Sequence, residues 1–269
     1  MDYTLNCNGR LLSLETPQVM GILNATPDSF FADSRQQTEE GIARRTHQIL
    51  DEGGSIIDVG ACSTRPDSQP VSEDEEMERL RFALPIVRRE APHAIISVDT
   101  FRPVVARMAV EEYDADIIND VGNHTSQFSV LSSPFDMFRM VSRLRVPYIY
   151  MSHKSTVKEV MLDCAEAVAA LRSMGQKDII LDPGFGFGKT LEENYALMQQ
   201  LERMQTLQLP LLVGISRKSM IWKLLQTTPD GALNGTTVLN TIALMKGADI
   251  LRVHDVRQAA ECVKLTSNP

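Results

Sequence analysis

Eight short apolar runs recur along the chain, and their pattern limits the possible folds more than any other feature of the sequence. They lie at Val19–Leu23, Ile56–Val59, Ile95–Val98, Ile117–Ile118, Tyr148–Met151, Ile179–Leu181, Leu211–Val213 and Ile250–Val253. Most read as near-continuous Val, Ile and Leu, which is typical of parallel strands buried on both faces. Intervals of roughly 20–40 residues suit strand–helix units, and eight such units form a barrel. We therefore expect an α/β fold, a single (β/α)8 TIM barrel; a doubly wound open sheet is the competing architecture.

The first residues differ from this pattern. Tyr3–Leu5 and Leu11–Leu14 flank Asn8-Gly9, a dipeptide that favours the type I′ turn of a β-hairpin. We expect residues 1–16 to form an N-terminal β-hairpin at the bottom of the barrel. No linker rich in Pro, Gly or Ser divides the chain, so residues 1–269 are expected to form a single domain.

Charge and cysteine content narrow the classes of partner. The formal net charge of −8 argues against nucleic-acid or anionic-membrane binding, because both need a positive field. The four cysteines are far apart and form no C-x-x-C pair, which argues against a zinc site or a disulfide scaffold. The chain starts with acidic residues where a signal peptide is basic, and no apolar run approaches the ~18 residues of a membrane span. We expect a cytoplasmic protein that binds small molecules.

Polar residues follow the apolar runs. Asn24, Asp99, Asn119 and Asp182 each stand at or just after the end of one run. In a barrel these strand ends face one mouth, where active sites are built. The acceptors and donors of Asp99, Asn119 and Asp182 suit a flat heterocycle with several N–H and carbonyl groups, such as a pterin. The alternative is that each residue merely caps the next helix or turn.

Basic residues are expected at the same mouth although the chain is acidic. Arg65, Lys218, Arg252 and His254 supply positive charge there, which indicates an anionic ligand. Arg252 and His254 are two residues apart on one strand and so share a face. For Arg252 the alternative is an ordinary salt bridge with a neighbouring acid.

A glycine-rich segment, Gly184–Thr190, resembles a phosphate-binding loop but does not match one. The P-loop pattern needs a Gly separated by four residues from the Gly188-Lys189 pair, and Pro183 stands there without a backbone N–H. The alternating glycines also fit no G-x-G-x-x-G fingerprint. We interpret the segment as a flexible loop over the mouth, with Phe187 available to pack on an aromatic ligand.

Seven motifs in order resemble those of the dihydropteroate synthases. They are Gly21–Asn24 with Thr26–Phe30, Ser63–Pro66, Ser97–Thr100, Ile117–Asp120, Leu181–Lys189, Ser216–Ser219 and Arg252–Asp255. The resemblance extends from Val19 to about Val256. It implies condensation of 6-hydroxymethyl-7,8-dihydropterin pyrophosphate with p-aminobenzoate, giving 7,8-dihydropteroate and pyrophosphate. It also implies a homodimer that uses its later helices, and sensitivity to sulfonamides.

Site roles follow from the same resemblance. The pterin site is implied at Asp99, Asn119, Met151, Asp182, Gly214 and Lys218. Pyrophosphate is implied at Asn24, Thr64, Arg65, Arg252 and His254, with Mg2+ bound through Asn24. The aminobenzoate site is implied at Thr64, Pro66, Phe187 and Ser219. Asp99, Asp182, Lys218 and Arg65 are the implied catalytic residues, which stabilise a delocalised pterin cation and the charge on the leaving group.

Several positions depart from the family pattern. Phe31–Ser34 replaces the usual Ser-Asp-Gly-Gly, and Cys62 stands where a Glu is usual; for Cys62 we expect a packing role. Met151–Lys154 differs from the usual Met-His-Met. We expect His153 on the surface and a shortened fifth helix layer. The alternatives are a divergent pterin-binding paralogue with weak or no synthase activity and a methyltetrahydrofolate-dependent methyltransferase.

Overall fold

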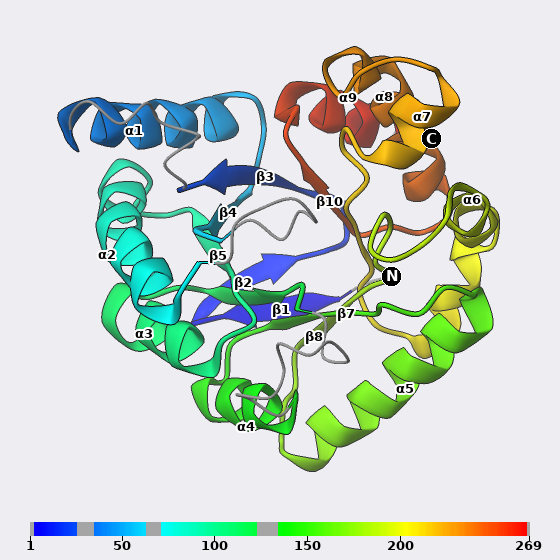
Figure 1. Ribbon diagram of the computed structural model, residues 1–269. Coiled ribbons are helices and arrows are strands. Elements are labelled where there is room, and N and C mark those ends of the chain that lie inside the picture. The colour runs from blue at the N-terminus through cyan, green and yellow to red at the C-terminus, as the bar shows by residue number, and fades with distance from the viewer. Residues whose placement is uncertain (1–2, 26–34, 63–70, 123–133, 268–269) are drawn as a thin grey trace.

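Eight parallel strands form a nearly closed barrel (Figure 1). The computed structural model describes residues 3–25, 35–62, 71–122 and 134–267. The strands are β3 (Gln18–Asn24), β4 (Ile56–Gly60), β5 (Ile95–Asp99), β6 (Ile117–Asp120), β7 (Tyr148–Met151), β8 (Ile179–Asp182), β9 (Leu212–Val213) and β10 (Ile250–Val253). Their order is β8-β7-β6-β5-β4-β3-β10-β9, and Leu181 N donates to the Pro210 carbonyl at 2.9 Å between the two ends. The expected barrel is confirmed, and the open sheet is excluded.

Helices surround the barrel. They are α1 (Arg35–Asp51), α2 (Glu73–Glu90), α3 (Pro103–Tyr113), α4 (Pro134–Leu144), α5 (Val157–Ser173), α6 (Leu191–Gln199), α7 (Ser219–Leu224), α8 (Leu233–Met245) and α9 (Val256–Thr266), with short 3-10 helices η3 (Leu201–Leu207) and η4 (Asp230–Ala232). Among the helices in the described ranges, none is long and apolar enough to cross a membrane.

The prediction of a shortened fifth helix layer was wrong. Helix α5 has 17 residues, the same length as α1. A capping box at Thr156 and Glu159 starts it, and this pattern satisfies two backbone N–H groups that the helix leaves unpaired. A capping box at Thr190 and Glu193 likewise starts α6.

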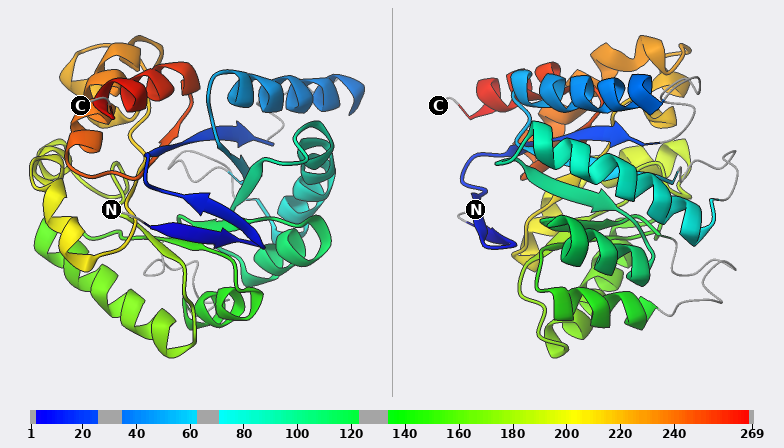
Figure 2. Two further views of the ribbon diagram at one scale, coloured as in Figure 1. Left: turned by 180° about the vertical axis from the view of Figure 1, so that it is seen from behind. Right: turned by 90° about the vertical axis from the view of Figure 1, so that its left-hand side faces the viewer.

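The N-terminal hairpin is confirmed. Strands β1 (Thr4–Cys7) and β2 (Arg10–Ser13) pair antiparallel around Asn8 and Gly9, whose φ angles of 51° and 88° are those of a type I′ turn. The hairpin crosses the end of the barrel where the strands begin (Figure 2). Arg10 on the hairpin and Arg88 on α2 both pair with the buried carboxylate of Asp116.

The lower interior of the barrel is a layer of apolar side chains. Every strand contributes one residue: Met20, Ile56, Ile95, Ile117, Ile149, Ile180, Leu212 and Ile250. The hairpin residues Leu5, Cys7 and Leu14 pack against this layer. The hairpin therefore covers the lower end of the barrel interior.

The next interior layer is different in chemistry. Side chains two residues apart on a strand share a face, so the layer above is Ile22, Asp58, Ser97, Asn119, Met151, Asp182, Gly214 and Arg252. Most of these residues are polar although they lie within or beside apolar runs. The change from an apolar to a polar layer occurs towards the carboxyl ends of the strands, where barrel active sites are found.

Candidate active site

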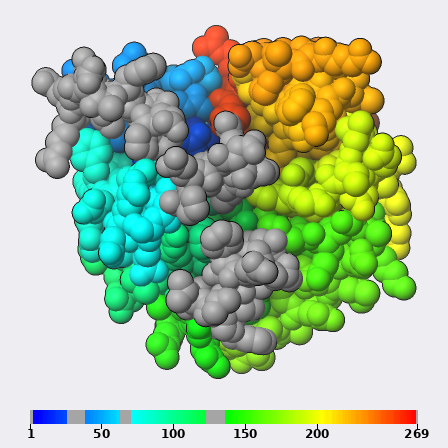
Figure 3. Space-filling model, in the orientation of Figure 1, coloured from blue at the N-terminus to red at the C-terminus, as the bar shows by residue number. Residues whose placement is uncertain are grey.

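The candidate site lies at the carboxyl ends of the barrel strands. Figures 1 and 3 view the molecule from this end, and helices from α2 round to α8 surround it. Asp99, Asn119 and Asp182 come from β5, β6 and β8 and are all buried. Met151, on β7 between Asn119 and Asp182, is buried as well. Four strands thus present the residues for which we expected a pterin-binding role.

Asp58 is the main residue of this layer that the sequence reasoning missed. Its buried carboxylate on β4 accepts hydrogen bonds from Ser97 Oγ (2.6 Å), Asn119 Nδ2 (3.1 Å) and Arg252 Nε (2.7 Å). In the sequence it stands within the apolar run Ile56–Val59. Its position in the sequence could have indicated this role, because Asp58 is two residues after Ile56 and both side chains therefore point to the interior face of the strand.

Arg252 joins Asp58 to Asp99. Its Nη2 donates to Asp99 Oδ2 at 2.6 Å, in addition to the bond from Nε to Asp58. Burial raises the pKa of Asp99 to about 7, although the Arg252 guanidinium opposes this shift. Burial by itself would lower the pKa of Arg252, but Asp58 and Asp99 together raise it. Arg252 therefore forms the salt bridge that was its alternative role, and both of its acidic partners, Asp58 and Asp99, lie inside the site.

Asp182 and Lys218 are groups of opposite charge at the mouth that shift each other's pKa. Burial raises the pKa of Asp182, with Lys218 acting in the opposite direction, and Gly184 N donates to Asp182 Oδ1 at 2.7 Å. Burial lowers the pKa of Lys218 to about 8, and Asp182 opposes that shift. Perturbed acids and bases gathered in one cleft are typical of functional sites.

The glycine-rich segment passes over Lys218. Lys218 Nζ donates to the Phe185 carbonyl and lies 4.4 Å from the centre of the Phe187 ring. Gly186 has a φ of 79°, and a Cβ there would come within 2.8 Å of Lys218 Cδ. A side chain at this position would displace the lysine, so the glycine is needed for close approach.

His153 is not the surface residue that we expected. Its ring nitrogen Nε2 lies 2.9 Å from the Gly122 carbonyl, and its ring meets Phe187 edge-on at 5.8 Å. The residue is half-buried because its strand-end position points it along the inner face above Met151. Phe187 is therefore packed between His153 and Lys218.

The remaining predicted groups lie at the same rim. Asn24 is exposed at the end of β3, and Ser219 begins α7 next to Lys218. His254 follows β10; its backbone N–H donates to Ser216 Oγ, and its carbonyl accepts from Arg45. At Gly214 a Cβ would lie 3.7 Å from Arg252 Cβ, so the glycine leaves open space beside the arginine.

The rim contains oxygen ligands that suit a hard cation. Within the described ranges no three His, Cys, Asp or Glu side chains gather into a metal cluster. However, a Cβ placed on Gly60 would lie 3.9 Å from Asn24 Oδ1 and 3.8 Å from Asp99 Oδ2. An amide oxygen and a carboxylate oxygen thus face one small space. This donor set fits Mg2+, which needs few protein oxygens when it also binds substrate phosphates.

Some predicted features lie outside the described residues. They are the motif Thr26–Phe30, the altered segment Phe31–Ser34 and the motif Ser63–Pro66 with Thr64, Arg65 and Pro66. Cys62, at the edge of the described part, is half-buried, and burial raises the pKa of its thiol. That direction disfavours the reactive thiolate and agrees with a packing role.

Arg217 belongs to the predicted basic motif but does not point into the site. Its Nε and Nη2 atoms bind both carboxylate oxygens of Asp255, at 2.9 Å and 2.8 Å. This two-pronged pair ties the loop after β9 to the loop after β10. Arg217 therefore supports the segment that carries Lys218.

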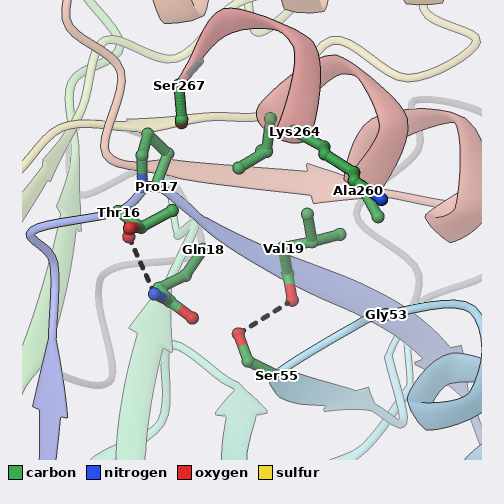
Figure 4. A pocket seen from close by; sticks show the side chains of 10 residues that line it. Thr16, Pro17, Gln18, Val19, Gly53, Ser55, Ala260, Lys264 and Ser267 are labelled. Carbon is green, nitrogen blue, oxygen red and sulfur yellow. Dashed lines mark hydrogen bonds between the residues drawn. The ribbon is translucent and has the colours of Figure 1, made fainter. Parts of the chain in front are cut away.

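A hollow at the other end of the barrel is separate from this site. It is lined by the start of β3 and the residues before it, by the residues before β4 and by the last turns of α9, including Gln18, Ser55 and Lys264 (Figure 4). Ser55 Oγ donates to the Val19 carbonyl there, and Gln18 Nε2 donates to the Thr16 carbonyl. No group of the polar layer lines it.

Comparison with known proteins points to one family. Residues 20–254 match the family model described as "Pterin binding enzyme". The dihydropteroate synthase of Escherichia coli strain K12 is 36% identical over 97% of this chain and 94% of its own length. The Xanthomonas albilineans dihydropteroate synthase solved with 4-aminobenzoic acid has a TM-score of 0.85 and 34% identity, covering 98% and 97% of the two chains. The Coxiella burnetii dihydropteroate synthase solved with pteroic acid has a TM-score of 0.83 and 31% identity, covering 98% of each.

Proposed function

The chain belongs to the dihydropteroate synthase family of pterin-binding enzymes, and from this premise we propose how its barrel mouth works. The enzyme joins 6-hydroxymethyl-7,8-dihydropterin pyrophosphate to p-aminobenzoate, forming 7,8-dihydropteroate and releasing pyrophosphate. The observation that carries the proposal is a set of buried groups at the carboxyl ends of the strands: Asn119, Met151 and Asp182 in the polar interior layer, and Asp99 two residues beyond Ser97 on β5. Lys218 is near enough to Asp182 to shift the pKa of that carboxyl. Such a set offers a planar pterin several hydrogen-bond partners and one apolar surface.

The reaction needs charge stabilisation more than a strong base. An aromatic amine already has a free lone pair, which attacks the exocyclic methylene of the pterin as the bond to pyrophosphate breaks. Asp99 and Asp182 supply negative charge beside the cationic pterin. Arg65, Arg252 and His254 stabilise the departing pyrophosphate.

The aminobenzoate site is proposed above the pterin. Phe187 offers an aromatic surface, held in place by His153 and Lys218. Ser219, at the first turn of α7, offers a hydroxyl to the carboxylate. Thr64 and Pro66 complete the proposed pocket. The Xanthomonas relative bound to 4-aminobenzoic acid supports this choice of second substrate.

Mg2+ is proposed as the cofactor, and Asn24 would hold it together with substrate phosphates. When bound, it would neutralise charge on the leaving pyrophosphate. Chelation with EDTA should abolish pyrophosphate release, and added MgCl2 should restore it.

A cytoplasmic homodimer, each protomer a single domain, is also proposed. Exposed apolar side chains gather on the later helices: Leu224 and Leu225 at α7, Val238 and Met245 on α8, and Leu265 on α9. Val238 and Met245 are seven residues apart and so lie on one face of α8. An exposed apolar surface of this kind suits a protein–protein contact.

Calorimetry and a turnover assay together test the function. Isothermal titration with the pterin pyrophosphate and MgCl2 should show binding, and pyrophosphate release should depend on p-aminobenzoate. Sulfonamides should compete with p-aminobenzoate once the pterin site is saturated. Binding without aminobenzoate-dependent release would instead identify a pterin-binding paralogue, and methyl transfer from methyltetrahydrofolate would identify a methyltransferase.

A further inference from the structure

Asn119 has one half of its amide paired and the other half free for a ligand. The side chain is fully buried on β6, and its Nδ2 donates to Asp58 Oδ2 at 3.1 Å. None of the described residues donates a hydrogen bond to its Oδ1, which is also buried. A buried acceptor without a partner is costly, so this oxygen is a position at which a bound ligand can supply the missing donor.

Asp58 decides which half of the amide is free. A carboxylate next to a guanidinium accepts hydrogen bonds and donates none. All three of its side-chain neighbours donate to it, namely Ser97, Asn119 and Arg252. If Asn119 turned its amide over, its Oδ1 would face the Asp58 oxygen, and two acceptors would be in contact. The amide therefore has one allowed orientation.

We propose that Asp58 is a positioning residue that sets the polarity of the pterin pocket by holding the Asn119 carbonyl oxygen towards the ligand. Asn119 then recognises an N–H group and disfavours an acceptor at that place. The same carboxylate restrains Arg252, which contacts Asp99. This inference rests on the proposed function, because it assumes that the ligand with the N–H group is a pterin.

The variant Asp58→Asn tests the inference directly. Asp58 Oδ2 accepts from both Asn119 Nδ2 and Arg252 Nε. An asparagine at position 58 that places its NH2 group there gives up the Arg252 contact and donates to Asn119 Oδ1, so the Asn119 amide is no longer limited to one orientation and can present its NH2 group to the ligand. A donor would then face a donor. The dissociation constant of the pterin pyrophosphate, measured by calorimetry in MgCl2, should rise about 10- to 100-fold, as expected when one charge-free hydrogen bond is lost and its partner is left unpaired.

The exchange variant Asp58→Asn/Asn119→Asp gives the sharper result. It keeps both residue types and the net charge but swaps their places. The new amide donates to the new carboxylate, whose second oxygen again faces the ligand as an acceptor. Affinity should return to within about threefold of the parent value, whereas Asn119→Asp alone should bind poorly because two carboxylates then face each other.

Asp116→Asn is the matched control. Asp116 is also a buried carboxylate. It pairs with two arginines, Arg10 and Arg88, but it lies at the hairpin end of the barrel. It should lower the melting temperature without changing pterin affinity. The inference is overturned if Asp58→Asn binds as tightly as the parent protein, or if the folded exchange variant binds no better than Asp58→Asn. If the exchange variant does not fold, the comparison of Asp58→Asn with Asp116→Asn decides. Absence of pterin binding by the parent protein would instead refute the proposed function.

Discussion

Lys218→Ala should remove a charged contact at the centre of the proposed site. The Lys218 ammonium donates to the Phe185 carbonyl and lies 4.4 Å from the centre of the Phe187 ring. These two contacts hold the ammonium at the mouth. A hydrogen bond from this charged group to the substrate would contribute about 1.5–3 kcal/mol, and its loss from the transition state corresponds to a roughly 10- to 150-fold fall in kcat/KM.

Steady-state kinetics with varied pterin pyrophosphate and p-aminobenzoate measures this effect. KM should rise for both substrates and kcat should fall, because the lysine reaches both proposed pockets. Lys223→Ala is the matched control: Lys223 also lies over an aromatic ring, 5.6 Å from the centre of Trp222, but on the exposed side of α7. It should change kcat/KM by less than about twofold.

The pH dependence provides a second test of Lys218. Burial lowers the pKa of Lys218 to about 8, so its charge is lost as the pH rises through that value. Activity should therefore decline above about pH 8. In Lys218→Arg the guanidinium stays charged, and any remaining activity should persist to higher pH. A Lys218→Ala enzyme with kinetics like those of the parent protein would refute this role.

Three further predictions concern the other charged and apolar groups. Burial raises the pKa of Asp99 to about 7, so the carboxylate is protonated below that pH and pterin affinity measured by calorimetry should fall about tenfold per pH unit; a flat profile would contradict the role of Asp99 as an acceptor. Arg10→Ala should lower the free energy of unfolding in urea by about 1 kcal/mol while kcat is unchanged, because Arg88 still pairs with Asp116; equal stability would show that the hairpin contact contributes nothing. Val238→Glu should give a monomer by sedimentation velocity, because a charge would enter the proposed interface; an unchanged dimer would place the interface elsewhere.

The fold was largely predictable because its strands and its hairpin turn are each specified by neighbouring residues, and the strand pattern recurs eight times along the chain. Parallel strands covered on both faces leave continuous Val, Ile and Leu runs, and the eight predicted runs became the eight strands. The turn at Asn8-Gly9 was equally clear because few residue pairs adopt two positive φ angles. The length of α5 was misjudged, because that expectation came from comparison with the family and not from the periodicity of residues 157–173.

The site was predictable in outline but not in its internal pairing. Polar residues at strand ends indicated Asp99, Asn119 and Asp182. Asp58 was hidden because the run Ile56–Val59 was treated as uniformly apolar. The pairing of Arg252 with Asp58 and Asp99 spans 194 and 153 residues of sequence. No local pattern encodes such contacts; they follow from which strand faces meet inside the closed barrel.

A crystal structure with 6-hydroxymethyl-7,8-dihydropterin pyrophosphate bound tests the central claim most directly. We predict that the pterin ring lies above Met151 with its polar edges against Asp99, Asn119 and Asp182, that Asn119 Oδ1 accepts a hydrogen bond from a ring N–H or amino group, and that Lys218 lies beside the ring. A pterin ring bound elsewhere, for example in the hollow beside Gln18 and Lys264 at the other end of the barrel, would contradict the account.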